Sequence, residues 1–475
     1  MARSTPFQLT RPIQWSDVYC EAEIYKAALR VYTKPLFHWR KALSTSVDGR
    51  TLYDFAGRGL RSLDSLHQAL QCKTFCFRPS VALHYNFNGK HRTIYLAPWE
   101  ERIVDLLLYR VLNHKLHDWF SQDSYAYREG SFGLDLCQTR IAAVLHVRKP
   151  LYVIKRDIAD YFATVDHDVL LSKLAGLVKP GDYLFRLLEQ RVRFLYQENG
   201  LTRQATLGIP FGTAIACLFA NIYLTELDRE IQRIGCVSYF RYADDILLLA
   251  RERDAAMQAT KILEEQLSGL RLSLKASREA NLLLSGDSPA DSVFTAAAEF
   301  RHLGLLFRAG GSIALSRDKL RKVQNLFSFA FRRARRRWKK VADPLGRAQL
   351  LVTIAAETIE HGLRNVAIID YYLKHVDDED QLQILDRWLA EEILSLVFGG
   401  HKKNHFRRIS FGQLRRMGLP SLLHRRRLIL RGKIESPFFI WQRQKATRAL
   451  RGTVARLPHS KSAAAFSLFP RSSSQ

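Results

Sequence analysis

Adjacent apolar runs on either side of two carboxylates dominate the middle of the chain. Residues 237–240 and 246–250 are apolar and rich in β-formers, and the short polar break between them contains Asp244 and Asp245. Alternating, β-rich runs around such a break predict a β-hairpin. Taken alone, the Asp-Asp pair also fits an ordinary surface turn, because Asp is a common turn residue.

A second apolar run changes the interpretation of that pair. Residues 151–154 are apolar and β-branched, and Asp157 lies just beyond them. We expect Asp157 to meet Asp244 across adjacent strands. Like charges this close are costly unless a cation neutralises them, and carboxylate oxygens suit Mg²⁺ or Mn²⁺. The pattern therefore favours a phosphoryl-transfer site with two metal ions held by Asp157, Asp244 and Asp245.

Apolar spacing predicts the other elements of the chain. Strands are expected over 81–87 and 91–96, around an Asn88-Gly89 turn, and a hairpin is expected over 300–307. Asp168 is a candidate N-cap for the helix that follows it. Apolar residues at helical spacing predict helices over 15–43, 62–70, 100–120, 134–146, 169–174, 184–196, 213–227, 253–267, 318–340, 348–374 and 380–398.

The net charge of +27 over 475 residues points to a polyanionic partner, most simply RNA or DNA. No apolar run approaches the roughly 18 residues of a membrane-spanning helix, so we expect no membrane association. Six cysteines without a zinc-binding pattern indicate reduced thiols in a cytoplasmic protein.

The positive charge is concentrated in the last third of the chain. Residues 401–455 contain fifteen Lys or Arg and one acid, with aromatic residues between them, which suits single-stranded or structured RNA. From about residue 460 a Ser/Ala-rich tail is expected to be disordered. The candidate nucleic-acid contacts are Arg332, Arg333, Arg335, Arg336, Arg337, Lys339, Lys340, Arg425, Arg426 and Arg427.

Short motifs in a fixed order resemble those of a reverse transcriptase. Asp157-x-x-Asp160-Tyr-Phe is followed by Gly208-Ile-Pro-Phe-Gly212, by Tyr242-Ala-Asp-Asp245 and by Arg301-His-Leu-Gly304. Upstream, Arg92-Thr-Ile94 and Pro98-x-x-x-Arg102-Ile-Val resemble the fingers motifs of the bacterial, group II intron-like branch, and Ser124-Tyr-Ala-Tyr-Arg128 resembles the Ser-Tyr-Gly-Phe-Arg signature of that branch. The resemblance covers roughly residues 75–310.

The resemblance implies a right-hand polymerase with an α/β (α+β palm) core. Its expected parts are an N-terminal helical extension (1–75), fingers and palm (76–310), a helical thumb (311–400) and a basic α-helical C-terminal region (401–475). Phe162 would lie beneath the sugar and favour deoxynucleotides, and Lys90 would replace a lysine that relatives carry six positions before Arg92, where this chain has Asn86. The nucleotide-binding residues implied are Arg92, Lys90, Phe162, Phe211, Gly212 and Arg278.

The activity implied is RNA-directed DNA synthesis with two Mg²⁺ or Mn²⁺ ions. The substrates would be deoxynucleotides and an RNA template, expected to be a dedicated noncoding RNA; the product would be DNA, and the enzyme could act as a homo-oligomer. Stand-alone antiphage-defence reverse transcriptases are the most similar group. Three alternatives stay open: a diversity-generating or intron-type enzyme, untemplated DNA synthesis, which Phe211 permits in place of the usual Gln, and a non-catalytic RNA-binding scaffold.

Overall fold

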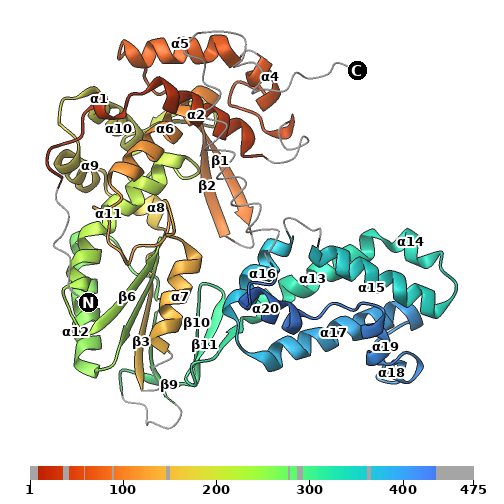
Figure 1. Ribbon diagram of the computed structural model, residues 1–475. Helices are drawn as coiled ribbons and strands as arrows, with labels where there is room; N and C mark the ends of the chain where they lie inside the picture. The colour runs from red at the N-terminus through yellow and green to blue at the C-terminus, as the bar shows by residue number, and fades with distance from the viewer. Residues whose placement is uncertain are drawn as a thin grey trace. The chain divides into compact units, whose positions relative to one another are not determined.

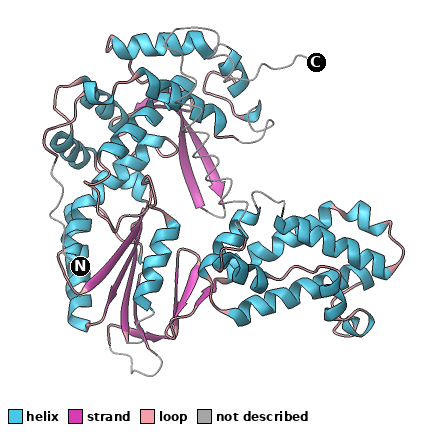
Figure 2. Cartoon of the chain, viewed as in Figure 1, coloured by secondary structure: helices cyan, strands magenta, loops and turns pink. Residues whose placement is uncertain are grey.

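The computed structural model describes residues 9–35, 42–57, 59–87, 90–145, 150–276, 279–285, 292–360 and 365–434. These residues form a mixed α/β structure (Figure 1 and Figure 2). They fall into two compact units. Unit 1 takes its described residues from Met1–Cys137 and Tyr152–Asn281, and unit 2 from Gln138–Leu151 and Leu282–Arg451. The predicted division into four parts stays a prediction.

A five-stranded sheet carries the predicted carboxylates, in the order β6-β7-β3-β8-β9. The predicted hairpin is confirmed, because β6 and β7 pair antiparallel and β7 also pairs antiparallel with β3. Helices α11 and α12 pack against β6 and β7, so this side of the sheet is apolar and buried. The elements are β3 (Leu151–Asp157), β6 (Val237–Tyr242), β7 (Asp245–Ala250), β8 (Ala280–Leu284), β9 (Thr295–Ala297), α11 (Ala214–Gln232) and α12 (Arg253–Gly269).

A second, four-stranded sheet in unit 1 has the order β2-β1-β4-β5. The predicted pair β1 (Ser80–Phe87) and β2 (Lys90–Leu96) is confirmed, although the turn residues 88–89 lie outside the described part of the chain. The hairpin of β4 (Leu195–Glu198) and β5 (Leu201–Gln204) was not predicted. Its signal was the Asn199-Gly200 pair, whose φ values of 51° and 78° suit a two-residue hairpin turn.

The remaining helices of unit 1 correct several predicted boundaries. The helix expected over 184–196 ends at Val192, because Leu195 begins a strand. The N-cap of α9 is Asp166 rather than Asp168, since the Asp166 side chain accepts from the Asp168 and Val169 amides. The helices are α1 (Trp15–Val18), α2 (Glu21–Thr33), α4 (Leu52–Gly57), α5 (Gly59–Gln71), α6 (Trp99–Lys115), α7 (Leu134–Leu145, which continues into unit 2), α8 (Tyr161–Thr164), α9 (His167–Leu177) and α10 (Tyr183–Val192).

Unit 2 combines a three-stranded antiparallel sheet with helices (cyan to blue in Figure 1). The predicted hairpin over 300–307 is confirmed by β10 and β11, but the single helix expected over 318–340 is wrong, since it breaks at Ala334. The elements are β10 (Glu299–His302), β11 (Leu305–Arg308), β12 (Ile313–Leu315), α13 (Arg317–Arg333), α14 (Arg335–Lys339), α15 (Pro344–Glu360), α16 (Asn365–His375), α17 (Glu379–Phe398), α18 (His405–Arg408), α19 (Phe411–Arg416) and α20 (Leu422–Leu430).

A fully buried ion pair fixes the β6–β7 hairpin in unit 1. Arg241 of β6 donates from Nε and Nη2 to the two carboxylate oxygens of Asp228 in α11, each at 2.6 Å, and both side chains have 0% exposure. Tyr239 donates to the same carboxylate, and Arg241 also donates to Ser124 Oγ at 2.8 Å. Every strong donor and acceptor of the pair is thus satisfied, as burial of charge requires.

Replacing Asp228 with Asn should destabilise unit 1 by about 3–5 kcal/mol, because it leaves the buried Arg241 charge without its counter-ion. Hydrogen exchange of the β6 and β7 amides would measure the loss. Glu226→Gln is the matched control: Glu226 lies on the same helix and pairs with Lys173 at the surface, where the expected effect is below about 1 kcal/mol. Equal protection in the two variants would contradict the role given to this ion pair.

Candidate active site

Strand register brings the three predicted carboxylates to one end of the sheet. Asp157 is the last residue of β3 and lies directly opposite Asp245, the first residue of β7. Asp244 occupies the turn before β7, and its carbonyl accepts from the Ile158 amide at 3.2 Å. The preceding residue, Ala243, has a φ of 61°, and its carbonyl accepts from Arg241. The buried arginine therefore shapes the turn that presents Asp244.

The carboxyl group of Asp244 is held in an unfavourable setting for its charge. Burial is the largest cause that raises its pKa to about 6, followed by the neighbouring charge of Asp157 and then that of Asp245. Asp157 also shares a side-chain hydrogen bond with Asp244. A cation between these groups would relieve both the desolvation and the repulsion.

The donor chemistry of this end of the sheet fits a hard divalent cation. All the side-chain donors there are carboxylate oxygens, which Mg²⁺ and Mn²⁺ prefer. Among the described residues, no group of three or more His, Cys, Asp or Glu side chains is already arranged to hold a metal ion. Asp157 lies opposite Asp245 in the strand register and shares a side-chain hydrogen bond with Asp244. Metal binding by all three carboxylates stays a prediction.

Three aromatic rings form a cluster in unit 1. One of them, Tyr127, is close enough to Asp244 to feel its charge, because burial is the largest cause that raises the Tyr127 pKa and Asp244 is a smaller one. Phe162 contacts Phe211 edge to face, with 5.1 Å between ring centroids, and contacts Tyr127 at 6.2 Å. The Arg92 guanidinium lies 5.7 Å from the centre of the Phe211 ring. The structure thus gathers Phe162, Phe211 and Arg92, which the sequence assigned to one nucleotide site, and adds Tyr127, which was not predicted. Its signal was its place in the Ser124–Arg128 motif.

The loop with Gly208 and Gly212 connects strand β2 to the helix α8 that carries Phe162. The Phe211 carbonyl accepts from the Tyr95 amide of β2 at 3.0 Å, and the Ile209 amide donates to the Phe162 carbonyl at 2.8 Å. Gly212 has a φ of 102°, and a Cβ there would lie 2.6 Å from Ile94 Cγ2. Only glycine permits this approach of the loop to β2.

Residues 85–306 of the chain match the family model described as reverse transcriptase (RNA-dependent DNA polymerase). Residues 85–306 belong to the reverse transcriptase family. The motifs that suggested this family from the sequence lie in or near the matched segment, and the carboxylates and rings described above come from it.

Several known proteins are similar to this reverse transcriptase segment. Protein YkfC of Escherichia coli is 26% identical over 40% of this chain and 58% of its own length. Retron Ec83 reverse transcriptase, also of E. coli, is 24% identical over 45% of this chain and 63% of its own length. An uncharacterized 91 kDa protein in the cob intron of Schizosaccharomyces pombe is 24% identical over 42% of this chain and 23% of its own length. The chain thus spans less than two thirds of each of these relatives.

Among solved structures, a telomerase from Candida albicans in complex with a fragment of telomeric RNA resembles the chain with a TM-score of 0.43 and 12% identity. The match covers 75% of this chain and 70% of the telomerase chain.

Two of the predicted nucleotide contacts lie partly or wholly beyond what the structure describes. Lys90 is the first residue of β2 and lies opposite Phe87 in the β1–β2 register, but its side chain is not among those that the structure describes. Arg278 lies outside the described residues. Both stay predictions.

The Arg102 and Arg128 side chains bind backbone carbonyls within unit 1. Arg128 is buried and donates to the carbonyls of Ser121, Ser124 and His117. Arg102 donates to the Ala97 carbonyl and lies over the Trp99 ring at 4.3 Å. Neither side chain forms an ion pair within the described part of the chain.

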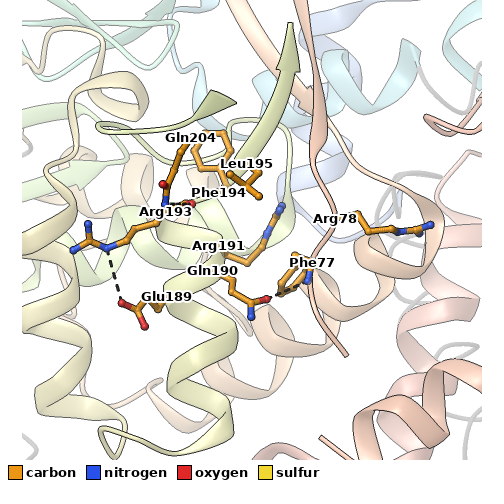
Figure 3. Close-up of a pocket in the computed structure, with 9 residues that line it drawn as sticks. All are labelled: Phe77, Arg78, Glu189, Gln190, Arg191, Arg193, Phe194, Leu195 and Gln204. Atoms are coloured by element: carbon orange, nitrogen blue, oxygen red, sulfur yellow. Dashed lines mark hydrogen bonds and ion pairs between the residues drawn. The ribbon is translucent and has the colours of Figure 1, made fainter. Parts of the chain in front are cut away.

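An open cavity of about 410 Å³ in unit 1 is separate from the candidate active site (Figure 3). It lies between the C-terminal end of α10 and the strands β4 and β5, with Phe77 and Arg78 on another side. None of the predicted catalytic or nucleotide-binding residues lines it. The carboxylate end of the sheet is therefore identified by its chemistry rather than by a deep cavity.

The two groups of predicted nucleic-acid contacts in unit 2 lie in different settings. The seven side chains from Arg332 to Lys340 are exposed, and none forms an ion pair with another described residue, whereas Trp338 among them is buried. Arg425 instead pairs with the buried Asp370, Arg426 donates to the Val376 carbonyl, and Arg427 pairs with Glu379. Arg425, Arg426 and Arg427 are therefore all engaged in contacts within unit 2. Binding of nucleic acid by these three residues stays a prediction.

Replacing Asp244 with Asn should stabilise the metal-free protein at pH 7–8 by about 2–3 kcal/mol. The folded-state pKa of about 6 exceeds the unfolded value, so wild-type stability falls as pH rises from about 4 to 6. The Asn variant lacks this loss, and the difference should disappear below pH 4. Urea unfolding across this pH range would measure it. Asp160→Asn, at an exposed carboxylate, serves as control. If the extra stability of Asp244→Asn were the same at every pH, the explanation from the raised pKa would be wrong.

Gly212→Ala should destabilise unit 1 at least twice as much as Gly200→Ala. Both glycines have positive φ, which costs a side chain about 1–2 kcal/mol, but a Cβ at Gly200 meets nothing within 4 Å. The additional loss of unfolding free energy at Gly212, compared with Gly200, would therefore measure the clash with Ile94. Adding Ile94→Ala to Gly212→Ala should recover part of the loss in urea unfolding, and no recovery would mean that the clash is not its source.

Proposed function

We propose that the chain is an RNA-directed DNA polymerase that acts by nucleotidyl transfer. The observation that carries the proposal is the carboxylate pair Asp157 and Asp244, held side by side at the end of two antiparallel strands with the pKa of Asp244 raised. The family of residues 85–306 supports the same reaction. The chain matches less than two thirds of the length of these relatives. We therefore propose the activity of the whole protein on the basis of its own site.

In this reaction a primer 3′-hydroxyl oxygen forms a bond to the α-phosphorus of a deoxynucleoside triphosphate. The bond from that phosphorus to the bridging oxygen breaks, pyrophosphate leaves, and the hydroxyl proton passes to water. Divalent cations, when bound, would lower the pKa of the hydroxyl and offset the charge of the pyrophosphate. Asp157 and Asp244 would hold these cations, and Asp245, opposite Asp157, would assist.

The rings of the aromatic cluster would select the sugar. Phe162 is braced by Phe211 and Tyr127 in edge-to-face contacts, so its ring cannot readily turn aside. A fixed ring beneath the sugar leaves no space for a 2′-hydroxyl, which favours deoxynucleotides. Arg92, over the Phe211 ring, would meet the triphosphate.

The exposed basic side chains of α13 and α14 would follow the phosphates of the template–product duplex. All seven predicted residues from Arg332 to Lys340 face solvent without carboxylate partners among the described residues, so their charge is available to a polyanion. Charge pairing with phosphates fixes position but not sequence. This surface therefore suits any duplex of the right shape.

We further propose that the template is a dedicated noncoding RNA and that the enzyme serves bacterial antiphage defence. The supporting observations are the charge of +27 and the basic stretch after residue 400. The Gly208–Gly212 motif with Phe211 and the long basic region resemble those of defence-associated reverse transcriptases, which favours this role. A role in a diversity-generating or intron-type retroelement is the competing assignment, and gene neighbourhood separates them.

Untemplated synthesis is a second candidate because of one observation. Phe211 contacts Phe162 through its ring and cannot hydrogen-bond a nucleotide, whereas the family often has Gln at this position. Apolar contact alone discriminates weakly between bases. The sequence of the product decides between copying and untemplated addition.

The protein purified with its co-expressed flanking locus should incorporate labelled deoxynucleotides in Mg²⁺, and Asp244→Asn should lower the rate by at least about a thousandfold. Sequencing of the bound RNA and of the DNA then tests for complementarity. Asp160→Asn is the control and should keep near wild-type activity, since Asp160 is exposed and lies in a left-handed turn that Asn tolerates. Homopolymeric or random DNA would favour untemplated synthesis. Bound RNA without any DNA, even with added primers, would overturn the enzyme proposal.

A further inference from the structure

An open groove of about 870 Å³ in unit 2 is lined by residues of α17, of α18 and of α19. Figure 1 shows where these three helices lie. One side of it is an exposed face of α17, where Ile384 and Arg387 are one turn apart. The other side comes from the segment that contains Lys403, Phe406 and Phe411. This volume is within the usual range of small-ligand sites, roughly 300–1,000 Å³.

The walls of the groove are apolar. Ile384 is 68% exposed, which is unusual for a large aliphatic side chain in the middle of a helix. Phe406 and Phe411 are half-buried and line the groove opposite it. Flat rings next to an aliphatic side chain form a surface on which a planar apolar group can stack.

The rim of the groove is mostly basic. Arg387, Lys403 and Arg415 line it, and the surrounding segment 401–434 contains eleven Lys or Arg and neither Asp nor Glu. Two acids also line the groove. Asp386 is buried, accepts from Ser421 and from the Leu422 amide, and lies 3.8 Å from Arg415, while Asp380 is exposed. The charge balance favours an anionic ligand.

Other basic side chains of this region are less available. Arg425 and Arg427 are committed to ion pairs with Asp370 and Glu379. Lys403, in contrast, is exposed and has no ion pair among the described residues, and the Arg415 guanidinium lies over the Phe411 ring at 5.2 Å. Arg387 pairs with Glu391, and Arg415 lies 3.8 Å from Asp386. Lys403 therefore supplies the charge of the groove that has no carboxylate partner among the described residues, next to the stacking surface of the two rings.

We propose that this groove binds an unstacked base of single-stranded RNA, with Phe406, Phe411 and Ile384 against the base and Lys403, Arg387 and Arg415 at the flanking phosphates. The inference rests on the proposed function, because that function supplies RNA as the ligand. It differs from template binding at the active site, since the groove lies wholly within unit 2.

The test measures binding of the full chain to a fluorescent, unstructured 12-nucleotide RNA by anisotropy at several salt concentrations. Phe406→Leu and Phe411→Leu should each weaken binding about tenfold, because base–ring stacking is lost, without changing the salt dependence. Lys403→Ala should reduce the slope of log K against log salt by about 0.7, as expected for one lost phosphate contact. Phe77→Leu, which alters a ring in the separate cavity of Figure 3, is the matched control and should bind as wild type.

Photocrosslinking with RNA that contains 5-iodouridine should label peptides with Phe406 or Phe411. Wild-type binding by both Leu variants, with crosslinks elsewhere, would overturn the inference and leave the groove for another ligand such as an acidic peptide. These readouts need no DNA synthesis, so they separate the two proposals. Loss of binding in the Leu variants would support the groove even if the protein made no DNA. If the Leu variants synthesised DNA and bound the RNA as tightly as wild type, the groove proposal would be wrong and the proposed polymerase function would stand.

Discussion

The buried pair of Arg241 and Asp228 is the contact on which the candidate active site depends. Arg241 lies on the strand that leads into the catalytic turn, and Asp228 on the helix beneath it. The backbone of Arg241 also exchanges hydrogen bonds with Asp123 and Tyr125, so the Ser124 motif is bound to the same strand. A charge in the core can be kept only if all its donors are satisfied. That requirement fixes helix, strand and motif in one arrangement.

The same strand ends where the protein tolerates an unfavourable charge. Asp244 is half-buried beside Asp157 and Asp245, and both its burial and these charges raise its pKa, while Ala243 before it is in a left-handed conformation. Locally unfavourable features of this kind persist where many surrounding contacts hold them in place. Here the rigid support comes from Arg241 below and from β3 beside the turn. Stability is thus given up at the point where a cation would be bound.

The basic runs of unit 2 look alike in the sequence, but their arginines lie in two different environments. The basic residues of α13 and α14 project into solvent, whereas Arg425 and Arg427 join α20 to α16 and α17 through ion pairs. Trp338 lies within the basic run but is buried, and its indole N–H donates to the Phe331 carbonyl. This residue therefore packs inside unit 2 while its basic neighbours are exposed. A basic run therefore identifies a charged region, while its exposed members must be found from the packing.

Local patterns were sufficient to predict the strand that ends at Asp157, the hairpin whose turn carries Asp244, and the family of residues 85–306, because strand patterns and short motifs are local properties. It missed the β4–β5 hairpin, whose strands are only four residues long and mostly polar, and it joined α13 to α14 because the apolar pattern continues across the break. Only the tertiary structure decided that Arg102 and Arg128 bind backbone carbonyls, that Phe211 braces Phe162, and that Arg425 pairs with Asp370. Those outcomes depend on partners far away in the sequence, and no local pattern specifies which partner a long side chain will reach.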